Sequence, residues 1–330
     1  MKKTFAIGAL LAGGVLSQAA FAVDTVQIDG SSTVFPVSEA MAEEFQSAQK
    51  GKIRVTVGVS GTGGGFKKFC RGETDITGAS RPISPEELAL CKENGVQPIE
   101  LPVAMDALTV VIHPDNTWAE MLTVDELKTM WEPEAQGKIT NWNQIRSDFP
   151  DRPLNLYGAG TDSGTYDYFT TAVVGKEHSS RGDFTASEDD NVLVMGVSGD
   201  VNALGFFGLA YYEENKDKLD AVAIKWKDNE PVMPSFETAG DSSYQPLTRP
   251  LYYYASKASI EEKDYVAKFT QFLLDEENKE LVKEVGYVPL SSKVYEAANE
   301  VLEKREVGTA YQGAEVGVDV AETLSRTKHY

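Results

Sequence analysis

The stretch VQIDGSSTVFPVSEAMAEEF at residues 26–45 indicates the fold class of this chain. Val26 and Ile28 alternate with polar residues, which is typical of a short strand, and the strand ends at Gly30. Apolar residues then recur at every fourth position, as they do on one face of a helix. These residues are Val37, Met41 and Phe45. The stretch therefore predicts a strand, a polar loop and a helix, in that order.

The same order occurs twice more. Residues 52–59 are rich in β-branched side chains and predict a strand, which leads into the glycine-rich loop Ser60–Gly65 and a short helix. Residues 154–157 predict a strand that leads into the loop Gly158–Thr165 and another helix. Strands that alternate with helices indicate the α/β class.

Helix-start signals and apolar runs predict further elements. Ser84–Glu87 and Thr123–Glu126 read as capping boxes, each of which begins a helix. Strands are expected at 107–112, 205–212, 223–226 and 251–255, and helices at 260–285 and 291–304.

Strong apolar strands begin just after Ala104 and just after Arg249, which suits a hinge of two strands. We therefore expect the chain to cross twice between two lobes, with the ligand cleft between them. Lobe I would hold residues 23–104 and 250–330, and lobe II residues 105–249.

The N-terminus has the parts of a cleavable secretory signal at residues 1–22. Met1-Lys2-Lys3 is basic, an apolar run extends from Phe5 to Leu16, and Ala20-Phe21-Ala22 forms a cleavage motif. The run is too short to span about 30 Å of hydrocarbon, which argues against a membrane anchor. We expect a mature chain that begins near Val23 and lies in the periplasm, or at the cell surface of a host with one membrane.

The chain has a formal net charge of −20. A charge of this sign repels nucleic acid and anionic lipid, which makes both poor partners. It also repels a small anion at long range, so an anion bound here must be held by short-range donors in a local pocket. With 42% apolar and 25% charged residues, the composition is typical of a globular protein.

Cys70 and Cys91 are the two cysteines of the chain. An even number in an exported chain favours a disulfide, with a pair of buried thiols as the alternative. His113, His178 and His329 are scattered in the sequence, without the spacing of a metal site. No metal or other cofactor is therefore expected.

Three loops share one design, in which a strand is followed by glycine, serine and threonine and then by a helix. They are Asp29–Thr33, Ser60–Gly65 and Gly158–Thr165. A helix N-terminus presents unpaired backbone N–H groups and favours negative charge, so each loop is suited to an anion. Ordinary helix capping explains one such loop, but three in one chain predict an anion site. The glycines precede Phe66-Lys67-Lys68 and do not form a nucleotide P-loop.

Two charged residues belong to these segments. Arg81 follows a strand-like segment and can donate paired hydrogen bonds to a tetrahedral oxyanion, with a surface arginine as the alternative. Asp162 lies among hydrogen-bond donors. A carboxylate there either accepts the proton of monohydrogen phosphate, which sulfate lacks, or caps the helix that follows.

An enzyme finds little support in the sequence. The chain has no G-x-S-x-G motif, and no histidine lies near the three loops in sequence.

Four segments together resemble a known family, namely Gly30–Pro36, Gly61–Lys67, Gly78–Ile83 and Gly160–Thr165. They resemble, in this order, the periplasmic phosphate-binding proteins of high-affinity phosphate ABC transporters. The resemblance covers essentially the whole mature chain. It implies a type II periplasmic binding protein fold whose two α/β lobes close on one phosphate and then dock on the transporter permease. We expect a monomer without covalent chemistry.

The resemblance also implies the ligand residues. In lobe I these are Ser32 and Thr33, the backbone N–H groups of Val34 and Phe35, the hydroxyl of Thr62, and Ser80 with Arg81. In lobe II they are Ser163, Gly164 and Thr165.

The chain departs from some family members at two positions. Those members carry an aspartate where this chain has Arg81, and an arginine just ahead of the Ser-Gly-Thr motif, where this chain has Asp162. We hypothesise that the charged pair has exchanged lobes. A binding protein for sulfate or arsenate, and a phosphate-ester hydrolase or an adhesin on the same fold, are the alternatives.

Overall fold

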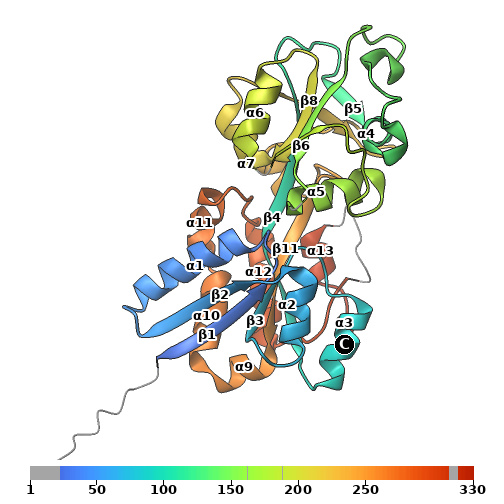
Figure 1. The fold of residues 1–330 in the computed structure, drawn as a ribbon. Coiled ribbons are helices and arrows are strands. Elements are labelled where there is room, and N and C mark those ends of the chain that lie inside the picture. The colour runs from blue at the N-terminus through green and yellow to red at the C-terminus, as the bar shows by residue number, and fades with distance from the viewer. Residues whose placement is uncertain (1–22, 162, 188, 312–318) are drawn as a thin grey trace, which may run out of the picture.

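The computed structural model describes residues 23–161, 163–187, 189–311 and 319–330. The chain forms two lobes, and the paired strands β4 (Pro98–Ile112) and β11 (Thr248–Ser256) run from one into the other (Figure 1). This two-lobed α/β architecture confirms the predicted fold class. The predicted signal, residues 1–22, lies outside the described ranges. Inside those ranges, no helix has the length and apolar character needed to cross a membrane.

One sheet extends through both lobes in the order β2-β1-β3-β11-β4-β8-β6-β7, with β9 beside β4. β1 is parallel to β2 and β3, and β6 is parallel to β7 and β8, whereas β4 and β11 are antiparallel to each other. A small second sheet pairs β5 (Met121–Thr123) with β10 (Ala223–Lys225). The other strands are β1 (Asp24–Gly30), β2 (Ile53–Val59), β3 (Ile76–Ala79), β6 (Asn155–Ala159), β7 (Thr185–Ser187), β8 (Ala203–Gly208) and β9 (Asp220–Ala221).

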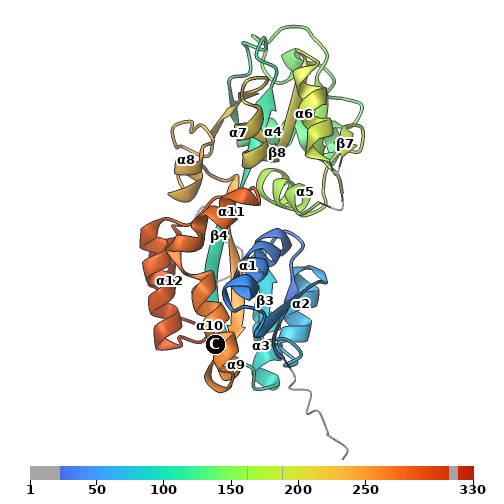
Figure 2. The same cartoon turned by 90° about the vertical axis from the view of Figure 1, so that its left-hand side faces the viewer.

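Helices pack around the sheet in both lobes (Figures 1 and 2). Those of the lobe with the N-terminal strands are α1 (Phe35–Ala48), α2 (Gly61–Phe69), α3 (Pro85–Glu93), α9 (Lys257–Glu262), α10 (Asp264–Leu273), α11 (Lys279–Glu284), α12 (Ser292–Lys304) and α13 (Val320–Leu324). Those of the other lobe are α4 (Val124–Trp131), α5 (Gly164–Phe169), α6 (Asp190–Ser198), α7 (Leu209–Asn215) and α8 (Phe236–Gly240).

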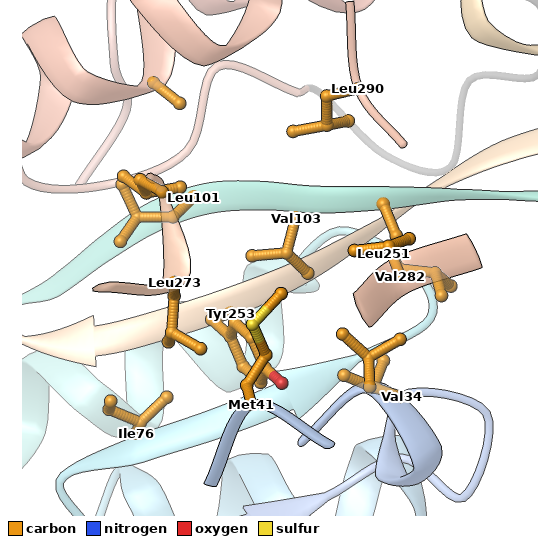
Figure 3. Close-up of a cluster of buried hydrophobic side chains, with 14 of the residues drawn as sticks. Val34, Met41, Ile76, Leu101, Val103, Leu251, Tyr253, Leu273, Val282 and Leu290 are labelled. Atoms are coloured by element: carbon orange, nitrogen blue, oxygen red, sulfur yellow. The ribbon is translucent and has the colours of Figure 1, made fainter. Parts of the chain in front are cut away.

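Alternation along β11 shows how the sheet buries both faces in the first lobe. Leu251 and Tyr253 belong to the core with α1, α10 and α12, where Figure 3 shows them near Met41 and Val103. Tyr252 lies on the opposite face, in the cluster with α2 and α3. Both faces are therefore covered by helices, as the predicted βαβ pattern requires.

The second lobe has a separate aromatic core. The rings of Phe169 and Phe206 stack at a centroid distance of 3.7 Å, and Trp131 meets Phe206 edge-on at 5.0 Å. Buried residues change from one core to the other between Ala107 and Leu108 on β4. The predicted lobe boundaries at residues 104/105 and 249/250 stay a prediction.

Three expected elements differ in the structure. The segment Ser60–Gly65 is not a loop, because α2 already begins at Gly61. The strand predicted at 205–212 ends at Gly208, where the apolar run continues as α7 and so hides the boundary. The helix expected at 260–285 consists of α9, α10, a 3₁₀ turn and α11.

Cys70 and Cys91 form a disulfide, as predicted. Cys70 caps the end of α2 and Cys91 lies on α3, so the bond joins these two helices. The enclosed segment contains Ser80 and Arg81. The disulfide therefore restrains a part of the chain that is expected to bind the ligand.

We expect removal of this disulfide to lower the free energy of unfolding by about 3 kcal/mol, because it closes a loop of 21 residues. Denaturant unfolding with and without reductant measures the difference. The double variant Cys70→Ser/Cys91→Ser is the control. Its unfolding midpoint should equal that of the reduced protein and should not change when reductant is added. An unfolding midpoint that reductant leaves unchanged would contradict the expectation.

Candidate functional site

A cleft of about 530 Å³ is lined by residues of both lobes. Six residues that the sequence predicts as ligands line it, namely Ser32, Thr33, Thr62, Ser80, Arg81 and Gly164. The predicted ligands Val34, Phe35, Ser163 and Thr165 lie beside these residues in the chain but outside the lining. Asp162 lies outside the described residues. The structure thus brings together residues that are about 130 positions apart in sequence, from Ser32 to Gly164.

The turn before α1 presents a backbone donor at the cleft. Ser31 folds this turn, because its Oγ accepts the N–H of Thr33 at 3.2 Å and its carbonyl accepts the N–H of Phe35 at 3.1 Å. The side chain of Val34 is buried, and no described group accepts a hydrogen bond from its N–H. Of the two predicted N–H donors, Val34 is therefore open and Phe35 is engaged.

The first turn of α2 presents a second set of donors. Gly61 and Gly63 line the cleft together with Thr62, and a helix cannot satisfy the N–H groups of its first turn by itself. The Thr62 hydroxyl lies 3.1 Å from Oγ of Ser80 and accepts the Ser80 N–H at 3.2 Å. This contact joins two predicted ligands that lie on separate elements.

Close packing of α2 against β1 explains one glycine of this segment. A Cβ on Gly65 would lie 2.5 Å from Cα of Gly30 and 2.5 Å from Oγ1 of Thr77. Only glycine lets the helix approach the strand this closely. Asp29 on β1 accepts hydrogen bonds from the Ser60 hydroxyl and from Lys68 at 2.7 Å. These bonds tie both ends of α2 to β1.

Arg81 lines the cleft, but its two terminal amines are engaged by a carboxylate. Nη1 and Nη2 donate to the two oxygens of Glu87 at 2.8 and 2.9 Å, and these hydrogen bonds raise the pKa of the guanidinium. Glu87 also closes the predicted capping box of α3 with Ser84. The helix start therefore fixes Arg81, and the paired contact expected with an anion is made here with Glu87.

A buried carboxyl group supports the Arg81 segment from behind. Tyr254 accepts the N–H of Ile83 at 2.9 Å and donates to Glu100 at 2.6 Å. Glu100 is fully buried, which raises its pKa, and it also accepts from the Thr309 hydroxyl and from the N–H of Ala310 at 3.0 Å. This network connects the cleft to the C-terminal part of the chain.

The second lobe contributes the start of α5. Ser163 is its N-cap, because its Oγ accepts the N–H of Thr165 at 3.2 Å. A Cβ on Gly164 would lie 2.1 Å from Oγ1 of Thr33, so the two lobes touch at this point. Glycine at the first helical position is what allows the contact.

An ion pair at the hinge is a part of the cleft that the sequence analysis missed. Arg249 on β11 lies opposite Asp106 on β4, with Nη2 and Oδ2 separated by 3.0 Å. Nη2 also donates to the carbonyl of Gly164 at 3.1 Å, and the guanidinium carbon lies 4.4 Å from the ring centre of Tyr168. The one available signal was the position of Arg249 at a predicted crossing between lobes.

The second lobe also brings Asp167, Glu177 and His178 together, and the first two line the cleft. Their ligand atoms lie within 4.8 Å of one another, and Nδ1 of His178 is 3.1 Å from Oδ1 of Asp167. Glu177 and His178 are exposed. The wide spacing of the histidines in sequence gave no sign of this cluster.

Open backbone N–H groups, hydroxyls and two arginines thus face one cleft, and each arginine is paired with its own carboxylate. This arrangement suits a small oxyanion, because it offers many directional donors and little net charge.

The chain is similar to known proteins along most of its length. Residues 17–277 match the model of a PBP superfamily domain. Protein SphX of Synechococcus elongatus is 51% identical over 288 residues, which cover 87% of this chain and 84% of that protein. The phosphate-binding protein PstS of Staphylococcus saprophyticus is 35% identical over 299 residues, covering 88% and 90%. A crystal structure described as a possible phosphate binding protein from Planctomyces limnophilus is similar with a TM-score of 0.75 at 46% identity, covering 86% of this chain and 99% of that one.

We expect Gly164→Ala to weaken anion binding by roughly tenfold, because the new methyl group must displace Thr33 or separate the lobes. The fold should persist, since alanine favours a helix over glycine by about 1 kcal/mol. Calorimetric titration with phosphate and sulfate, together with thermal unfolding, measures both effects.

Gly208→Ala is the matched control, because a Cβ at this helix start would meet nothing within 4 Å. Unchanged anion affinity in Gly164→Ala would show that the contact with Thr33 is not needed for binding.

Proposed function

Because the chain belongs to the PBP superfamily, we propose that it captures inorganic phosphate in the cleft between its lobes and delivers it to the permease of an ABC transporter. The observation that carries the proposal is the meeting of Thr33 and Gly164 at one cleft, since each lies in a predicted anion loop of a different lobe. Relatives named as phosphate-binding proteins support the choice of anion.

The proposed ligand set combines hydroxyls, backbone N–H groups and charged side chains. It consists of Ser32, Thr33, Val34, Phe35, Thr62, Ser80, Arg81, Asp162, Ser163, Gly164 and Thr165. Donors from both lobes then bind one anion, so the ligand favours the closed form over the open one. The engaged N–H of Phe35 makes it the weakest member of this set.

Phosphate capture in this proposal is binding without covalent chemistry. The protein acts as a monomer in the periplasm, where the proposed signal at residues 1–22 directs it, and nucleic acid is not a partner. The net charge of −20 supports the exclusion of nucleic acid. A relative named as a phosphate-binding protein supports binding without covalent chemistry.

We expect the mature protein, stripped of bound anions, to bind one phosphate per chain and not to bind sulfate. The donors fit either tetrahedral anion, but only monohydrogen phosphate brings a proton for an acceptor in the site. Calorimetric titration with each anion measures this directly. Equal binding of sulfate would contradict the choice of anion, and a phosphatase assay with and without divalent metal tests the hydrolase alternative.

Replacing Asp162 by Asn tests the source of this selectivity. If the carboxylate accepts the phosphate proton and repels sulfate, Asp162→Asn should narrow the ratio of phosphate to sulfate affinity by roughly tenfold or more. The matched control is Asp167→Asn, which removes the charge of an acidic residue that lines the cleft. A ratio unchanged from that of the wild type would show that Asp162 is not the source of the selectivity.

A further inference from the structure

The guanidinium of Arg249 has one amine without a described partner. Nε donates to Oδ2 of Asp106 at 3.0 Å, and Nη2 donates to the carbonyl of Gly164 at 3.1 Å. Among the described residues, none accepts a hydrogen bond from Nη1. The side chain is 15% exposed and lines the cleft. Nη1 is therefore available to a ligand in the cleft.

A second buried arginine shows what a purely structural ion pair looks like in this chain. Arg181 binds Asp183 through Nε and through Nη2 at 2.9 Å, and its Nη1 donates to two backbone carbonyls at 3.1 and 2.8 Å. All of its nitrogens are thus engaged, and it does not line the cleft. Arg249 also meets its carboxylate through Nε and Nη2. Its Nη1, however, has no carbonyl partner among the described residues.

The other arginine of the cleft is less available. Both terminal amines of Arg81 donate to Glu87, and Nη1 also donates to the carbonyl of Pro82 at 3.1 Å. An end-on contact of both terminal amines of Arg81 with an anion would have to break the bonds to Glu87. Arg249 can reach an anion without losing either of its present partners.

Arg249 also lies where the two lobes meet. The position of a Cβ on Gly164 would be 2.1 Å from Oγ1 of Thr33 and 3.9 Å from Nη2 of Arg249. A predicted ligand from each lobe and the hinge arginine therefore surround one point. That point is too tight for a further atom, but all three residues line the cleft beside it, where an anion can bind.

We propose that Arg249 binds the captured anion through Nη1, while Asp106 and the Gly164 carbonyl hold its guanidinium between the lobes. The inference rests on the proposed function and adds a ligand to it. Asp106 neutralises the buried cation by itself, and the anion then joins a pair that is already in place. Because Arg249 and Asp106 lie opposite each other on β11 and β4, the anion becomes tied to both hinge strands.

Paired substitutions separate binding from stability. Arg249→Met should raise the Kd for phosphate roughly 30-fold or more and should lower Tm, because it also leaves Asp106 buried without its partner. Arg249→Met/Asp106→Leu removes both charges and should recover most of the lost Tm. Its Kd should stay raised. Arg181→Met is the matched control, which should lower Tm without changing the Kd.

Arg249→Lys is a milder variant that keeps the charge beside Asp106. One ammonium group cannot replace the fork that contacts Asp106, Gly164 and the anion together, so its Kd should also rise. Wild-type phosphate affinity in Arg249→Lys, or in the double variant once Tm has recovered, would overturn the inference.

The titrations use phosphate, arsenate and sulfate with the wild type and every variant. Wild-type binding of sulfate or arsenate in place of phosphate would reject the proposed function, and the same variants titrated with that anion would still decide the role of Arg249. Wild-type protein that binds none of the three would overturn both.

Discussion

The pairing of β4 with β11 is the constraint on which the rest of the structure depends. Both strands belong to both lobes, and all 15 residues of β4 are buried, so a carboxylate on β4 needs a partner inside the protein. Two such carboxylates, Glu100 and Asp106, lie on β4. Glu100 holds the Arg81 segment through Tyr254, and Asp106 holds the start of α5 through Arg249. One buried strand thus positions a binding segment in each lobe.

The elements that the sequence predicts correctly are those with local signals. The capping boxes at Ser84 and Thr123 form as expected, because a side chain and a backbone group three residues apart need no distant partner. The sequence predicts a loop at Ser60–Gly65, yet α2 begins at Gly61, because close packing on Gly30 outweighs the low helix propensity of glycine. The ligand list contains Arg81 but lacks Arg249. The latter depends on Asp106, which is 143 positions away and which no local pattern connects to it.

The net charge of the whole chain is negative, whereas the arginines of the cleft are each paired with a carboxylate. The chain has 51 acidic and 31 basic residues, so its overall charge does not attract an anion from a distance. Inside the cleft, Arg81 and Arg249 are each neutralised by a carboxylate, and most of the predicted ligands offer hydroxyls or backbone N–H groups. Recognition therefore depends on hydrogen-bond direction, which is also the property that distinguishes a protonated anion from an unprotonated one.

The contacts of Glu100 also bear on the order in which the chain folds during synthesis. The core with Trp131 and Phe206 draws its residues from one continuous span, from Leu108 to Leu247, and can form as soon as that span has been made. The other core needs β11 to fill the gap between β3 and β4, and Glu100 has its partners only when Thr309 and Ala310 are present. The lobe with the N-terminal strands is thus the last to be completed, and the first ligand loops in the sequence reach their final positions only after residues 309 and 310 have been made.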